Sequence, residues 1–181
     1  MRQCFNIMIL LAVLSTVYAC TTIIPPKWEY EEEAIKLQIK ASSDLHWQDD
    51  KPHTLHLCVY QLRDRNEFDH LAGYDEGLSS LVNYRCEFVD PTVIKPESLF
   101  VYPGKPQSVT LSRAREAKYI AIAAGYERLS KDRSTKVIEI PLITVTKGFI
   151  SRKKIQKPGH LNIEIILGKE QILDIHEIKG K

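Results

Sequence analysis

Apolar and polar side chains alternate along residues 34–41, where Ile35, Leu37 and Ile39 share one side. A period of two predicts a strand with one buried face. Residues Leu55–Leu62 are apolar at almost every position, which predicts a central strand that is covered on both faces. The polar and acidic residues 42–54 between these two segments predict a loop.

The period changes between residues 63 and 83, where Phe68, Leu71, Leu78 and Leu81 recur at helical spacing, interrupted by glycines. We expect two short helices, or one broken helix, laid over the sheet. Further strands are expected over residues 86–89, 99–102, 108–111, 119–126, 137–145 and 160–167. Residues 172–178 fit either a last strand or a loosely packed tail. About eight short strands with a short helical insertion predict a mainly β fold, a β-sandwich.

The first twenty residues follow a third pattern. Arg2 precedes an apolar run that is too short to span a bilayer comfortably and that ends in small residues, as in a removable secretory signal. Val17, Ala19 and Cys20 occupy the positions of a bacterial lipobox. This motif predicts cleavage before Cys20, a diacylglyceryl thioether on its sulfur and an acyl group on its amine. The alternative is an ordinary signal peptide with a chance cysteine.

With Cys20 as a lipid anchor, we expect three parts: a signal peptide (residues 1–19), a lipidated tether (20–33) and one β-sandwich domain (34–181). Three acyl chains would hold the protein in a membrane essentially permanently. Thr21 follows the cysteine, in place of the aspartate that retains many Gram-negative lipoproteins in the inner membrane. The expected location is therefore the outer membrane, with the body in the periplasm.

The charge of the chain is nearly balanced, at +2 for 25 basic and 23 acidic residues, and at +1 once Arg2 leaves with the signal peptide. This balance argues against a nucleic-acid partner. A local basic cluster, Arg152, Lys153, Lys154 and Lys157, is expected in a loop. It is either a solubilising turn or a surface that attracts anionic lipid or an acidic partner.

Two cysteines remain in the body, Cys58 and Cys86, and the compartment is oxidising. They form either a disulfide or two buried small apolar residues, because their spacing does not give the distance between their Cα atoms.

The residues show no constellation for catalysis. His53 and His56 lie three apart in an extended segment, so their rings point to opposite faces and we expect no shared metal ion. No metalloprotease, CxxC, nucleophile-elbow or phosphate-loop motif occurs. We expect a connector, not an enzyme, with no cofactor apart from the covalent lipid on Cys20.

The chain resembles the TssJ family, the outer-membrane lipoproteins of the type VI secretion system. The matching pieces are, in order, the lipobox at Cys20, the first strand running into Ala41-Ser42-Ser43-Asp44-Leu45, Val59-Tyr60-Gln61-Leu62, Pro103-Gly104 before Val109-Thr110-Leu111, and the strand from Tyr119 to Tyr126. The resemblance covers roughly residues 14–145. His46 departs from the asparagine that is usual in the family, and Ser134-Thr135-Lys136 stands where a Trp-Arg pair is frequent.

The resemblance implies a transthyretin-like β-sandwich with added helical elements. It also implies binding to the periplasmic C-terminal region of the inner-membrane protein TssM, in a complex that also contains TssL. The contact loop of the family corresponds to residues 42–54, so the expected partner-binding residues are Ser43, Asp44, Leu45, His46, Trp47, Gln48, Asp49 and Asp50. The alternative is another envelope-assembly lipoprotein with a β-sandwich body that binds a different periplasmic partner.

Trp47 stands out because it is an aromatic residue within a polar and acidic loop. Aromatic anchors supply much of the energy of protein interfaces, often about 2 kcal/mol or more on truncation. We interpret Trp47 as such an anchor, or else as a plug that folds back onto its own sandwich.

Overall fold

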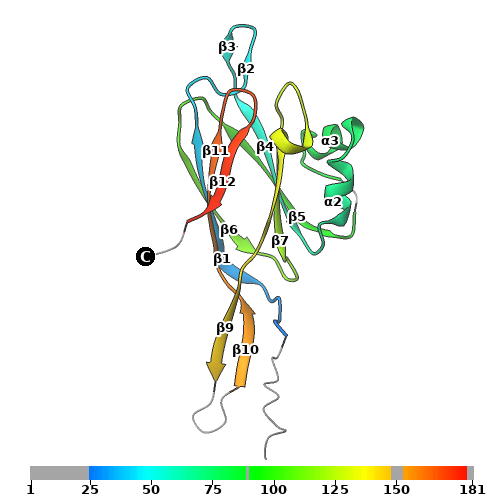
Figure 1. Cartoon of the computed structure of the whole chain (residues 1–181), viewed down its shortest axis with the longest axis vertical. Helices are drawn as coiled ribbons and strands as arrows, with labels where there is room; N and C mark the ends of the chain where they lie inside the picture. Colours follow the sequence, from blue (N-terminus) through cyan, green and yellow to red (C-terminus); the bar gives the residue numbers. More distant parts are fainter. Residues whose placement is uncertain (1–24, 89, 148–152, 179–181) are drawn as a thin grey trace, which may run out of the picture.

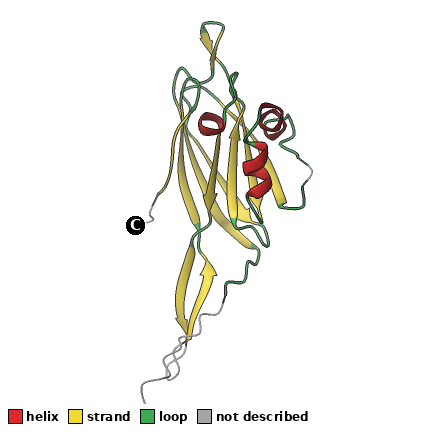
Figure 2. Ribbon diagram, turned by 45° about the vertical axis from the view of Figure 1, so that its right-hand side comes forward, coloured by secondary structure: helices red, strands yellow, loops and turns green. Residues whose placement is uncertain are grey.

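The computed structural model describes residues 25–88, 90–147 and 153–178, which form two facing β-sheets with short helices on one side (Figures 1 and 2). The strands are β1 (Glu31–Ala41), β2 (Trp47–Gln48), β3 (Lys51–Pro52), β4 (Leu55–Leu62), β5 (Val93–Val101), β6 (Gln107–Arg113), β7 (Tyr119–Ala124), β8 (Thr135–Glu139), β9 (Leu142–Lys147), β10 (Lys153–Pro158), β11 (Leu161–Leu167) and β12 (Ile172–Glu177). The helices are α2 (Asn66–Leu71), α3 (Asp75–Leu81) and α4 (Lys131–Ser134). One four-stranded sheet has the order β12-β11-β1-β6 and the other β5-β4-β7-β8, so the predicted sandwich is confirmed.

β1 lies inside the first sheet, where it pairs in parallel with β11 and antiparallel with β6. Leu37 and Ile39 are at most 1% exposed, and their neighbours on β11 are Ile163 and Ile165. The alternating pattern is therefore confirmed as a strand with one face in the core. The strand begins at Glu31, so the last part of the predicted tether is already within the sheet.

β4 lies between β5 and β7 in the second sheet, and both of its faces are covered. Leu57 and Val59 point into the core between the sheets, while Cys58 and Tyr60 belong to a second apolar cluster under the helices. Two covered faces explain why almost every position of this segment is apolar, and the prediction of a central strand is confirmed.

α2 and α3 cover the outer face of the second sheet (Figure 1). Phe68 and Leu81 pack in one cluster with Tyr60, whose hydroxyl donates a hydrogen bond to the Leu81 carbonyl at 2.6 Å. A Cβ atom at Gly77 would lie 2.2 Å from the Leu71 carbonyl oxygen, so the glycine lets the two helices touch. The expected pair of short helices is confirmed. No helix in the described segments has the length and apolar character needed to cross a membrane.

The strand predicted over residues 86–89 is wrong over its described residues, 86–88. Cys86 lies in a turn with a φ of 55°, stabilised by a hydrogen bond from its amide to the Asn83 carbonyl at 2.9 Å. A positive φ interrupts an extended strand. The next strand, β5, begins only at Val93.

The single strand predicted over residues 137–145 is also wrong, because the chain divides at Pro141 into β8 and β9. β8 continues the second sheet beside β7, whereas β9 leaves the sandwich and pairs with β10. Proline has no amide hydrogen for a sheet ladder, which favours a break at this residue.

The strand assignments test two predictions about the C-terminal part of the chain, one on the basic cluster and one on residues 172–178. The basic cluster does not lie wholly in a loop, because Lys153, Lys154 and Lys157 belong to β10; Arg152 lies outside the described residues. Ile172–Glu177 forms β12, an edge strand antiparallel to β11, so this segment is a last strand and not a loose tail.

Cys58 and Cys86 are joined by a disulfide in the structure, with 5.4 Å between their Cα atoms. The bond fastens the turn after α3 to the central strand β4. We expect peptide mapping without reduction to recover one linked peptide pair that separates into two on reduction. Alkylation of both cysteines in the folded, unreduced protein would contradict the disulfide.

The N-terminal segment before β1 is fixed to the body. Trp28 packs against the core, and its carbonyl accepts a hydrogen bond from the Glu116 amide at 2.7 Å. Arg113, only 3% exposed, donates to the carbonyls of Glu29 and Gly159 at 3.3 and 3.2 Å and to the Glu31 carboxylate at 2.7 Å. The described chain is therefore held in place from Trp28 onward.

Glu31 balances the buried charge of Arg113 and also lies 3.0 Å from the His160 ring. Burial by itself would raise the pKa of Glu31, but the hydrogen bond from His160 and the Arg113 guanidinium favour the carboxylate and hold its pKa below the usual value. A lowered pKa means that this stabilisation is complete above the usual glutamate pKa and is lost as the pH falls through the lower folded value.

Glu31→Gln is expected to lower the free energy of unfolding at neutral pH by about 1–2 kcal/mol, because Arg113 keeps its burial and loses its counter-charge. Thermal unfolding at pH 7 and through the acid range measures the effect. The matched control is Glu32→Gln, a neighbouring exposed glutamate, which should change little. Equal melting temperatures for the two variants would contradict the role of the Arg113 pair.

Candidate functional site

The loop between β1 and β4 contains a small hairpin that projects from one end of the sandwich (Figures 1 and 2). Trp47 pairs with Pro52, and Gln48 pairs with Lys51. The two residues between the strands, Asp49 and Asp50, have φ angles of 50° and 57°. Positive φ at both central residues is the mark of a type I′ turn, and aspartate tolerates it better than most side chains.

The base of this loop is tied to the body. Leu45 is fully buried in the core, and its carbonyl accepts a hydrogen bond from the His53 amide at 3.1 Å. The Trp47 amide donates to the Lys169 carbonyl at 3.0 Å, which links the hairpin to the turn between β11 and β12. The hairpin is therefore held in a defined position.

Trp47 is partly exposed and is not one of the described side chains that pack against the apolar clusters. The Lys169 ammonium lies 4.9 Å from the centre of its ring, within the range of a cation–π contact. The interpretation of Trp47 as a plug is wrong for this conformation, because Leu45 fills the core beneath the loop instead.

A second wall faces the hairpin. Tyr126 is 4% exposed, and its hydroxyl donates to the Gln171 carbonyl at 2.8 Å. Burial raises the pKa of Tyr126 well above its usual value, although a hydrogen bond with Gly168 acts in the opposite direction. The ring of His46 meets the Tyr126 ring edge-on, with 6.0 Å between their centres. These contacts connect the hairpin to the end of β7.

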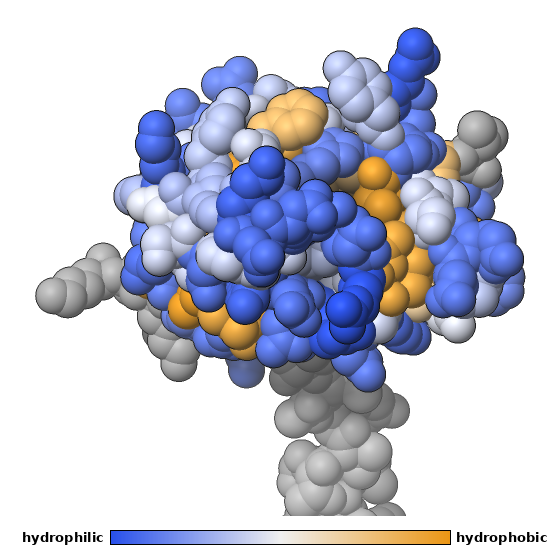
Figure 3. Space-filling view, turned by 90° about the horizontal axis from the view of Figure 1, so that it is seen from above, coloured by the Kyte–Doolittle hydropathy of each residue, from blue (hydrophilic) through white to orange (hydrophobic). Residues whose placement is uncertain are grey.

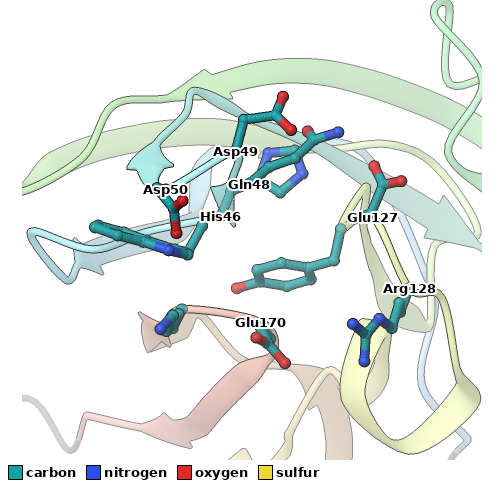
Figure 4. A pocket seen from close by; sticks show the side chains of 10 residues that line it. His46, Gln48, Asp49, Asp50, Glu127, Arg128 and Glu170 are labelled. Atoms are coloured by element: carbon teal, nitrogen blue, oxygen red, sulfur yellow. The ribbon is translucent and has the colours of Figure 1, made fainter.

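The two walls enclose an open cavity of about 340 Å³ (Figure 4). Hairpin residues lie on one side, and Glu127, Arg128 and Glu170 face them from two other loops. Seen from this end, the surface is mostly hydrophilic, with a few apolar residues between the polar ones (Figure 3). The cavity is lined by His46, Trp47, Gln48, Asp49, Asp50, Tyr126, Glu127, Arg128, Lys169 and Glu170.

The cavity is acidic, with four carboxylates and two permanent cations among its lining side chains. His46 donates from Nδ1 to the Thr54 carbonyl at 3.1 Å, and its buried Nε2 has no partner among the described residues. An unpartnered acceptor and an excess of carboxylates over cations suit a donor-rich or basic segment of another chain. The described groups that line the cavity include no activated nucleophile beside a base.

Of the predicted partner-binding residues, five line the cavity, from His46 to Asp50. Ser43 is exposed outside it, Asp44 accepts a hydrogen bond from the Ser42 hydroxyl at 2.6 Å, and Leu45 is structural. Cys20 lies outside the described residues. Sequence reasoning missed the opposite wall, for which the only signal was Tyr126 at the end of a predicted strand.

The two histidines of the loop and β4 have separate surroundings. His53 donates from Nε2 to the Gln48 carbonyl at 3.1 Å, whereas His56 lies beside Ser98 at 2.8 Å and stacks on Phe100. His56 also approaches the sulfurs of Cys58 and Cys86, but both sulfurs are in the disulfide. This group therefore offers a metal ion only one imidazole.

The family model described as "Type VI secretion lipoprotein, VasD, EvfM, TssJ" matches residues 33–169 of this chain. This match contains the loop and most of both sheets, whereas β12 and the cavity residue Glu170 lie beyond it. No curated protein matches the chain at a significant level.

Solved structures share the fold. TssJ1 of Pseudomonas aeruginosa aligns with a TM-score of 0.59 and 14% identity, over 86% of this chain and 100% of that one. Serratia marcescens Lip, a membrane-bound component of the type VI secretion system, aligns with a TM-score of 0.57 and 19% identity, over 81% and 98%. A chain of a structure described as the TssM C-terminal domain from EAEC gives a TM-score of 0.54 and 15% identity, over 81% and 98%. The chain belongs to the family of type VI secretion lipoproteins.

Proposed function

We propose that this lipoprotein is a connector, not an enzyme, in the type VI secretion membrane complex. Acyl chains on Cys20 hold it in the outer membrane, and the loop of residues 42–54, together with the cavity that it helps to line, binds the periplasmic C-terminal region of TssM. TssL completes the complex. Thr21 after the lipidated cysteine favours the outer membrane as the destination.

The main support for this proposal is that the proposed binding hairpin and the end of the chain nearest to the lipid anchor lie far apart on the molecule. The β2–β3 hairpin and the N-terminal end of the described chain lie at opposite ends of the long axis (Figure 1). β1 connects them with eleven residues, a length of roughly 36 Å. A body anchored at its N-terminal end therefore presents the hairpin away from the membrane, toward a protein that rises from the inner membrane.

The fixed position of Trp28 also limits the tether. Eight residue steps separate Cys20 from Trp28, and they reach at most about 28 Å when fully extended. The body therefore stays within a short distance of the bilayer, and a partner meets the hairpin at a limited range of depths in the periplasm.

The proposal is tested by titrating the full lipidated protein, held in detergent micelles, with the purified periplasmic C-terminal region of TssM. Isothermal calorimetry should give saturable binding, and mass spectrometry of the same sample should find the lipid on Cys20. Heat of dilution alone at micromolar concentrations would contradict the partner, and an unmodified Cys20 would contradict the anchor.

A further inference from the structure

The β9–β10 hairpin takes no part in the TssM site described above. It extends beyond the sandwich at the end where the described N-terminal segment lies, opposite the β2–β3 hairpin (Figures 1 and 2). Its two strands pair only with each other among the described strands. An isolated two-stranded hairpin is at best marginally stable in water, so this one is expected to gain stability from a surface that it touches.

The base of the β9–β10 hairpin is firmly held. The Gly159 amide donates to the Pro141 carbonyl at 2.7 Å, and the buried Arg113 donates to the Gly159 carbonyl at 3.2 Å. Arg113 also binds Glu29 and Glu31 in the segment that leads to the tether. The hairpin therefore keeps a fixed direction relative to the point where the tether leaves the body.

The charged residues of β9 and β10 are all basic. β9 and β10 contain four lysines and no acidic residue. The rest of the chain from Cys20 onward carries 20 basic and 23 acidic residues, so its net charge is negative. Lys154 and Lys157 are exposed, which leaves their ammonium groups available to an anionic surface.

The hairpin is also amphipathic. The register places Ile143 opposite Lys157 and Val145 opposite Ile155, so these four residues share one face. Ile143 is 44% exposed although it is apolar. The other face carries Leu142, Thr144 and Thr146 of β9 and Lys154, Gln156 and Pro158 of β10, so exposed lysines border the hairpin on both faces. Apolar residues next to lysines suit the boundary between the headgroups and acyl chains of a membrane.

We propose that the β9–β10 hairpin rests on the anionic phospholipids of the membrane that holds the lipid anchor, and thereby sets the orientation of the body. This inference rests on the proposed anchoring at Cys20. β9 has six residues, a length of about 20 Å, and the eight residue steps from Cys20 to Trp28 reach at most about 28 Å, so the hairpin and the anchor reach the same bilayer. Two contacts with the membrane fix the direction of the body, whereas the anchor alone is a single point of attachment.

The test uses the full lipidated protein reconstituted in vesicles. Because Cys58 and Cys86 are paired and Cys20 carries lipid, a single new cysteine takes a fluorescent label selectively. The label is placed on Ile143→Cys in one sample and on Gln48→Cys, at the opposite end, in the other. Vesicles of phosphatidylcholine are compared with vesicles that contain about 30% phosphatidylglycerol, both with a nitroxide quencher on the headgroups.

We expect the label at position 143 to be quenched in the anionic vesicles, and to lose most of this quenching at about 0.5 M salt or in phosphatidylcholine alone. Lys154→Gln with Lys157→Gln should decrease the ratio of bound to detached hairpins roughly 30-fold. The matched control, Lys51→Gln with Lys105→Gln, removes the same charge from exposed lysines elsewhere and should leave quenching unchanged.

Equal quenching in both kinds of vesicle, or equal quenching of the two label positions, would overturn the inference. So would cross-linking of the hairpin to a second copy of the protein in place of lipid contact. A failure of the anchor is distinguished from these outcomes, because protein without lipid on Cys20 would not float with phosphatidylcholine vesicles.

Discussion

Trp47→Ala is expected to weaken the binding of the TssM periplasmic region about 30- to 100-fold, while the melting temperature of the protein falls by less than about 3 °C. The ring lies at the edge of the cavity, partly exposed and outside the apolar core. Its removal takes little from the folded state beyond the cation–π contact with Lys169. In a complex the same ring would be desolvated, which is where aromatic anchors contribute most.

Trp28→Ala is the matched control for this prediction. Trp28 is the same residue type at the other end of the molecule, packed against the core. It should lower the melting temperature and leave the affinity of the folded protein unchanged. If Trp47→Ala unfolds early and its folded fraction binds normally, Trp47 is a stabilising residue and not a binding anchor.

Cys20→Ser is expected to abolish attachment to the outer membrane, because serine cannot form the thioether that carries the lipid. The body should remain folded and should bind TssM in solution with unchanged affinity, since Trp28 and β1 hold the N-terminal segment without the lipid. Secretion should fall to the level of a strain that lacks the protein.

Fractionation of cells, calorimetry of the purified variant and an assay of type VI secretion measure these three outcomes separately. Thr21→Ser, one residue further along, keeps the lipidated cysteine and serves as the control. Normal secretion by cells that contain only Cys20→Ser would refute the anchoring role, even if the protein were found to bind TssM.

The strands with clear patterns could be predicted because the order of apolar and polar residues within each segment indicates which of its faces are buried. The alternation around Leu37 and the doubly covered Leu55–Leu62 both match their places in the sheets. The break between β8 and β9 could also have been predicted, because Pro141 lies inside the segment 137–145 and proline cannot donate to a sheet ladder. The turn at Cys86 could not be predicted in this way, because no neighbouring residue indicates the positive φ of Cys86.

Only the part of the site from residues 46–50 was predicted, because the rest of the cavity comes from loops that are distant in the sequence. Trp47 could be singled out as an aromatic residue in a polar loop, but its neighbour Lys169 comes from a turn between the last two strands. Tyr126 lies two residues after the end of β7, and no spacing rule relates it to His46. The pairing of Cys58 with Cys86 stayed open for the same reason, because sequence separation does not fix the distance between two Cα atoms.

Site-specific photo-cross-linking in cells tests most directly whether the hairpin end meets TssM. A photoreactive residue replaces Gln48 in the cavity wall or Glu116 beside Trp28 at the other end of the sandwich. If the hairpin end binds TssM, position 48 forms a covalent adduct with TssM and position 116 forms none. An adduct from position 116 without one from position 48 would contradict binding at the hairpin end.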